Sequence, residues 1–238
     1  MTGSVAIIVT IVVIAFALLA GRSARGSGDQ YAARGLELHA AEDHVRCVRV
    51  LQTALDKGVS PEQYPLVRTC LGNSYYELDE YDLAIENHKK ALDADPQFYN
   101  AWVNLGIAYR IIGEFDEAEE CYKKALAIEP EYAELHSSIG ALYIFQEKYH
   151  LAVIHLEKAT ELDKQIPSAW SNLALAYATI GQFDKADAML KKSVILGYQK
   201  AAIIRERIDS LKAVASDPQP GGDQTGGPQT GDGAHNMN

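Results

Sequence analysis

The chain places four tyrosines at intervals of 34 residues: Tyr75, Tyr109, Tyr143 and Tyr177. Other residues keep this interval, because a glycine or alanine stands three residues before each tyrosine and an alanine stands nine residues after it. We call each set of residues spaced by 34 a column. A fixed period of this size is typical of one supersecondary unit that has been copied and stacked. The columns therefore predict a repeat protein.

The unit around Tyr109 has the pattern of two helices. Trp102, Leu105 and Tyr109 recur at i, i+3 and i+7, which places them on one helical face. Gly106 and Ala118 are small, so two helix backbones can approach closely beside them. Each unit is therefore expected to be a hairpin of two helices that buries its apolar face by stacking on its neighbours. The stop signals after the two helices are Gly113 and Pro130.

These columns resemble the tetratricopeptide repeat (TPR) family, whose unit follows the pattern W-x2-L-G-x2-Y…A-x3-F…A-x4-P. The resemblance implies an all-α fold, a right-handed α-solenoid of stacked antiparallel helix hairpins. It also implies a concave surface, lined by the first helix of each unit, that binds peptides or partner helices. The unit that matches the pattern most fully has Trp102, Leu105, Gly106, Tyr109, Ala118, Tyr122, Ala125 and Pro130.

Five units and a terminal helix are expected. The first unit is degenerate, because Gly35 and Gly72 are 37 residues apart instead of 34. After the last unit, the segment Lys200–Val214 has Ile203, Ile204, Ile208 and Leu211 at helical spacing, which indicates a capping helix within residues 199–214. An amphipathic helix that binds a partner or a membrane surface is the alternative. The units are expected at 28–61, 65–98, 99–132, 133–166 and 167–197.

Residues 1–25 are expected to form a transmembrane anchor with a basic flank. Val5–Gly21 is a run of 17 residues without a charge, close to the shortest length that spans a bilayer. A secretory signal peptide is the alternative, but no Lys or Arg precedes the run. Arg22 and Arg25 follow it, so the positive-inside rule places the repeats in the cytoplasm of a single-pass membrane protein. Export of the repeats is the other topology.

The C-terminal segment 217–238 differs in composition from the repeats. Nine of its 22 residues are Gly or Pro, and it has no Lys or Arg. Such a segment has too little apolar surface to offset the entropy of ordering, so a disordered tail is expected.

Composition and motifs argue against several function classes. The net charge is −10 and no basic stripe follows a helix, which disfavours nucleic-acid binding. No catalytic motif and no metal-type Cys or His spacing is present, so neither an enzyme nor a cofactor is expected. The three cysteines, Cys47, Cys70 and Cys121, are expected to be free, packed thiols.

A partner is expected on the first helices, on the face turned away from the tryptophan, leucine and tyrosine columns. The resemblance also allows a test for the carboxylate clamp of chaperone-binding TPR domains. Its asparagines have matches in Asn73 and Asn104, but Thr69, Glu134 and Ser138 stand where its cations would be. Binding of chaperone C-termini is therefore disfavoured. The candidate groove residues are Asn73, Tyr76, Asn104, Ile107, Arg110, Ser137, Ile144 and Asn172.

Two stretches around groove asparagines, Ala101–Gly106 and Ala169–Ala174, resemble the repeats of O-linked N-acetylglucosamine transferases. In that family, groove asparagines hydrogen-bond the backbone of a bound peptide. The sequence thus predicts a membrane-tethered adaptor or scaffold that binds a protein or peptide in its groove. A regulatory subunit of a membrane-associated enzyme complex and a self-assembling scaffold are the alternatives.

Overall fold

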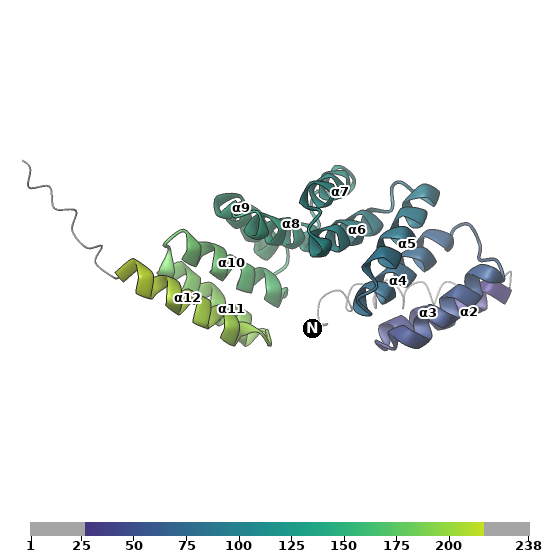
Figure 1. Ribbon diagram of the computed structural model, residues 1–238, viewed down its shortest axis with the longest axis horizontal. Coiled ribbons are helices and arrows are strands. Elements are labelled where there is room, and N and C mark those ends of the chain that lie inside the picture. The colour runs from purple at the N-terminus through teal and green to yellow at the C-terminus, as the bar shows by residue number, and fades with distance from the viewer. Residues whose placement is uncertain (1–26, 217–238) are drawn as a thin grey trace, which may run out of the picture.

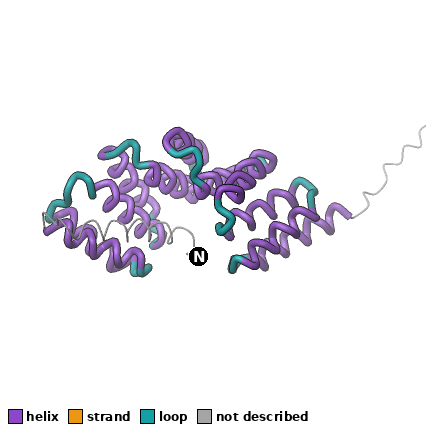
Figure 2. Tube along the Cα trace, turned by 180° about the vertical axis from the view of Figure 1, so that it is seen from behind, coloured by secondary structure: helices purple, strands orange, loops and turns teal. Residues whose placement is uncertain are grey.

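The protein is described by a computed structural model over residues 27–216, and this part of the chain contains helices and loops but no strand (Figure 2). The first ten helices form five hairpins, which follow one another along an arch from α2 and α3 at one end to α12 at the other (Figure 1). The helices are α2 (Ser27–Ala40), α3 (His44–Asp56), α4 (Tyr64–Glu77), α5 (Tyr81–Ala94), α6 (Tyr99–Ile112), α7 (Phe115–Ile128), α8 (Ala133–Phe145), α9 (Tyr149–Leu162), α10 (Pro167–Thr179), α11 (Phe183–Ile195) and α12 (Ala201–Ser216). The structure thus confirms an all-α helical solenoid.

Four of the five described hairpins are held by close contact between a glycine of the first helix and a large side chain of the second helix, 16 residues later. Unit five has Ala174 at the glycine position. A Cβ atom at Gly106 would lie 2.5 Å from the ring of Tyr122. The same construction at Gly140 gives 2.4 Å to Leu156. Real Cβ atoms do not approach this closely, so glycine sets the separation of the two helices.

The turn inside each hairpin has a residue in the left-handed conformation. In units two to five these residues form one column, with Gly113 at φ 88° and Glu147 at φ 58°. The N–H of the following residue donates to the carbonyl of the column tyrosine, for example from Glu114 to Tyr109 over 3.0 Å. This bond is the long-range bond of a Schellman motif, which ends the first helix. The tyrosines that reveal the repeat in the sequence therefore also close its turns.

Residues of the tryptophan column hydrogen-bond to the loop that connects their unit to the preceding one. Trp102 Nε1 donates to the carbonyl of Pro96 over 2.9 Å, and Trp170 Nε1 donates to that of Lys164 over 2.9 Å. His136 replaces tryptophan in unit four, and its Nε2 lies 3.0 Å from the carbonyl of Pro130. Tryptophan and histidine in this column therefore both place a ring nitrogen at hydrogen-bond distance from the corresponding backbone carbonyl of the preceding loop.

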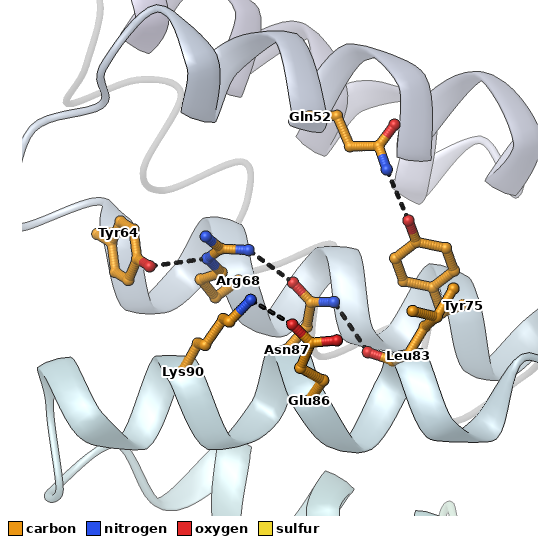
Figure 3. Close-up of polar contacts among 8 residues, drawn as sticks. All are labelled: Gln52, Tyr64, Arg68, Tyr75, Leu83, Glu86, Asn87 and Lys90. Atoms are coloured by element: carbon orange, nitrogen blue, oxygen red, sulfur yellow. Dashed lines mark hydrogen bonds and ion pairs between the residues drawn. The ribbon is translucent and has the colours of Figure 1, made fainter.

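Unit two has Arg68 in the tryptophan column, and this side chain makes different hydrogen bonds from those of Trp102 and Trp170 (Figure 3). Arg68 donates through Nε to the hydroxyl of Tyr64 and through a terminal nitrogen to Oδ1 of Asn87, both over 2.9 Å. Asn87 in turn donates to the carbonyl of Leu83 over 2.8 Å. Arginine thus joins α4 to α5 instead of closing the preceding loop.

Helix α12 packs against α10 and α11 and covers the open end of the stack. Ile208 is fully buried, and Ile204 and Leu211 pack against the same cluster. The sequence also assigned Ile203 to this apolar face, but that is wrong, because Ile203 is exposed. Asp187 of α11 accepts ion pairs from Arg205 and Lys212 of α12, each over 2.7 Å.

The expected anchor, residues 1–25, and the expected tail, residues 217–238, lie outside the described residues. Between Ser27 and Ser216, none of the helices combines the length and the apolar character that a bilayer crossing requires.

The glycine contact predicts that Gly106→Ala destabilises the protein. The added methyl group would collide with the buried Tyr122 ring, and such overpacking costs about 1–3 kcal/mol. The higher helix propensity of alanine offsets up to about 1 kcal/mol of this loss. Urea unfolding followed by circular dichroism measures the change. The loss should shrink in a Tyr122→Leu background, because unit five combines Ala174 with Leu190; an equal loss in both backgrounds would contradict the steric explanation.

The turn column predicts that Glu147→Gly stabilises the protein. Glutamate at φ 58° is strained by about 1–2 kcal/mol, whereas glycine is not. Glycine also adds freedom to the unfolded chain, so a net gain of about 0.5–1 kcal/mol is expected in the same urea experiment. The control is Gly113→Glu at the corresponding turn, which should lower stability. If Glu147→Gly had a lower free energy of unfolding than the wild type, relief of strain at the left-handed residue would not be the main effect of the substitution.

Candidate functional site

The inner side of the arch is lined by the first helix of each unit. Among residues 27–216, α4 contacts both α2 and α6, and α8 contacts both α6 and α10, while no second helix contacts the second helix of the next unit. Successive elements lie closest on the concave side of a curved stack. The first helices therefore form the inner face, and α7 and α9 lie on the outer side (Figure 1).

Two of the predicted groove residues are not accessible in the structure. Asn73 and Ser137 are both buried, so their assignment to an open surface is wrong. The column of Ser137 is buried throughout, and its member Val103 belongs to a core cluster together with Leu135 of α8. This column faces the next unit. A single hairpin would leave this side of its first helix exposed, and the first helix of the next unit covers it in the stack.

The other six predicted residues are half-buried and remain open to a ligand. Three of them, Tyr76 on α4, Arg110 on α6 and Ile144 on α8, share one column and lie in three successive units. Asn104 and Asn172 share another column, two units apart. The half-buried residues are Tyr76, Asn104, Ile107, Arg110, Ile144 and Asn172.

Arg110 is the central feature of this face. Its guanidinium carbon lies 5.2 Å from the centre of the Phe145 ring. Its Nε is buried and has no hydrogen-bond partner, and none of the ion pairs found between residues 27 and 216 includes Arg110. A planar guanidinium without a carboxylate can bind a carboxylate or carbonyl oxygen of a ligand.

Two tyrosine hydroxyls lie near this guanidinium. Burial raises the pKa of Tyr76, and the positive charge of Arg110 opposes the rise. Burial likewise raises the pKa of Tyr122, and the positive charge and close approach of Arg110 oppose the rise. Both hydroxyls therefore stay protonated at neutral pH and can donate a hydrogen bond.

The sequence reasoning missed Phe145, which stacks on Arg110 from the neighbouring helix. Its column contains Glu77, Ile111, Phe145 and Thr179, so apolar side chains in units three and four replace polar ones in units two and five. The change from polar to apolar residues within this column is the sequence signal that could have identified Phe145.

A separate cleft of about 440 Å³ lies between α5, α6 and α7. Lys124 Nζ lies 4.2 Å from the centre of the Trp102 ring in this cleft, and Lys89 Nζ lies 5.5 Å from that of Tyr109. Lysines thus cover both aromatic rings, which makes the cleft a charged surface feature. No group of three metal-ligating side chains occurs in the described part of the chain.

Solved structures with the same fold confirm the repeat architecture. A thermophilic TPR protein of Thermus thermophilus is 23% identical over 79% of this chain and all of its own, with a TM-score of 0.63. MamA of Desulfovibrio magneticus is 17% identical over 71% of this chain and 94% of its own, with a TM-score of 0.59. YrrB, described as a TPR protein with an unusual peptide-binding site, is 18% identical over 68% and 92%, with a TM-score of 0.51. At these identities the likeness shows the fold alone.

A search of the curated proteins found no match. Family models do match, and they cover more than half of the chain. A TPR repeat model matches residues 72–110, and tetratricopeptide repeat models match residues 99–132, 133–166 and 167–194. With the five stacked hairpins, these matches show that the chain belongs to the tetratricopeptide repeat family.

Proposed function

We propose that this protein is a membrane-tethered TPR adaptor that binds a peptide or helix of a partner protein on the inner face of its arch. The observation that supports this most directly is the guanidinium of Arg110, which lies against the Phe145 ring and has no carboxylate partner between residues 27 and 216. A guanidinium without a carboxylate partner binds a ligand oxygen through its other N–H groups. The ligand should therefore offer an oxygen acceptor at this point.

The neighbouring side chains suit an extended peptide. Asn104 is half-buried on the same helix, and an amide side chain can both donate to and accept from a peptide backbone. Ile107 and Ile144 offer apolar contacts beside it. The fold is similar to that of YrrB, which is described as having a peptide-binding site, and this likeness agrees with the proposal.

Tethering is the second part of the proposal. Val5–Gly21 has the length and composition of a single span, and Arg22 and Arg25 follow it directly. In this arrangement the repeats lie in the cytoplasm and hold the partner close to the membrane.

Substitution of the groove residues should reduce partner capture. The variant Asn104→Ala with Arg110→Gln removes the amide and the cation, so photo-crosslinking of the intact protein in its own membrane should recover at least tenfold less partner. Arg207→Gln on the exposed side of α12 is the control and should capture as the wild type does. Equal recovery of the same partner by the groove variant, with an unchanged circular-dichroism spectrum, would remove the groove from the proposal.

Two C-terminal reporter fusions test the topology. A fluorescent protein that matures only in the cytoplasm should be bright, and a phosphatase that is active only after export should be inactive. Replacing both Arg22 and Arg25 by Glu should move part of the population to the opposite orientation, since those two charges direct the insertion. An active phosphatase fused to the wild-type chain would contradict the cytoplasmic location.

A further inference from the structure

A second surface lies at the ends of the first helices and adjoins the predicted groove at Phe145, which stacks on Arg110. Four large apolar side chains are exposed there, with 37% of Leu78, 40% of Ile111, 42% of Ile112 and 58% of Phe145 open to solvent. We call these four residues the turn-edge patch. Leu78 and Ile112 share one column, and Ile111 and Phe145 share the adjacent one.

Side-chain contacts connect the part of the patch that lies in units three and four. Ile111 and Ile112 follow Arg110, whose guanidinium lies under the Phe145 ring. The Phe145 ring is also 6.3 Å from that of Phe115 at the start of α7. The exposed side chains of units three and four therefore form one surface, and Leu78 occupies the column of Ile112 in unit two. Scattered single apolar residues would need no explanation.

The fold does not require this exposure. Ile180 occupies the column of Leu78 and Ile112 in unit five, and there it packs against the core cluster shared with α12. The same column is thus covered at the end of the stack and open in its middle.

Acidic side chains surround the patch. Seven exposed carboxylates lie in the turns of units two to four or in the first turn of the helix that follows. No ion pair found between residues 27 and 216 involves any of them, although Asp79 accepts a hydrogen bond from the hydroxyl of Tyr81. The basic groups nearby are Arg110, which stacks on Phe145, and Lys148, which lies over the Tyr143 ring. Lys89 and Lys124 lie in the cleft that Asp116 and Glu117 also line, where each lysine covers an aromatic ring. The acidic residues are Asp79, Glu80, Asp82, Glu114, Asp116, Glu117 and Glu147.

We propose that the turn-edge patch binds an amphipathic helix of a partner protein, with lysines or arginines on both sides of its apolar stripe. Packed helices lie about 8–10 Å apart, and residues i and i+7 of a helix lie about 10.5 Å apart. One partner helix can therefore place successive apolar side chains on Leu78 and Ile112. The acidic rim attracts the basic flanks and repels an anionic lipid surface.

The test uses the full chain in an uncharged detergent. The probe is a 14-residue peptide of leucine and lysine with leucines at i, i+3, i+4 and i+7 and one photo-reactive side chain. Its twin has glutamate in place of lysine. The lysine peptide should bind at least tenfold more tightly, more weakly as salt rises, and should crosslink to the turns of units two to four.

The patch variant is Leu78→Ser with Ile112→Ser, which leaves Arg110 and Asn104 intact. It should weaken binding of the lysine peptide at least tenfold, while capture by the groove stays at the wild-type level. The matched control is Ile154→Ser with Val194→Ser, which removes two exposed apolar side chains elsewhere and should have no effect. Glu80→Gln with Glu114→Gln tests the rim independently of the patch, and it should lower both the affinity and its salt dependence.

Several results would overturn the proposal. They are equal binding of the two peptides, wild-type binding by the patch or rim variant, or crosslinks that map to other surfaces. Binding to phosphatidylserine vesicles that depends on Leu78 and Ile112 would assign the patch to a membrane instead. A dimer that the patch variant dissociates in light scattering would assign it to a second copy of the chain.

Discussion

The contact between a glycine of the first helix and a bulky side chain of the second determines the geometry of each hairpin. With a Cβ at Gly72, Gly106 or Gly140, the separation to the facing side chain would fall to between 2.4 and 2.7 Å. Glycine therefore lets the helices approach until the facing side chain fills the space between them. Because the same contact recurs in four units, successive hairpins have similar shapes and can stack in a regular array.

Stacking then divides the residues of each first helix into buried and open columns. First helices contact their counterparts in the neighbouring units, whereas second helices do not, so the array curves and its inner face is narrow. Columns that point along the stack, such as that of Val103 and Ser137, are covered by the next unit. Columns that point across it, such as that of Tyr76, Arg110 and Ile144, stay half-open. Specificity can reside only in the open columns, because the buried ones must keep the stack together.

The sequence predicts the helices and their order because the period is repeated in so many columns that chance agreement is excluded. It does not predict which side of a first helix the next unit covers, and for this reason it assigns Ser137 to the surface although its whole column is buried. Asn73 is buried as well, although Ile107 in the same column is half-buried. It also misses Phe145, whose contact with Arg110 joins residues of different units through the curvature of the array. Similarly, Arg68 breaks the tryptophan column, and only the packed structure shows that it joins Tyr64 to Asn87. Local periodicity thus determines the elements, whereas contacts between units determine the site.

The acidic residues at the turns can serve either to stabilise the helix dipole or to bind another molecule. The exposed apolar residues among them favour the second role. Carboxylates such as Asp116 and Glu117 lie in the first turn of α7, where they stabilise the helix dipole without any ligand. Leu78 and Ile112 stabilise the hairpin only through the covered part of each residue, because 37% of Leu78 and 42% of Ile112 stay open to solvent. The open part of each side chain is available to another molecule. Partly open apolar residues beside carboxylates that form no ion pair between residues 27 and 216 therefore favour a surface that is completed by another molecule.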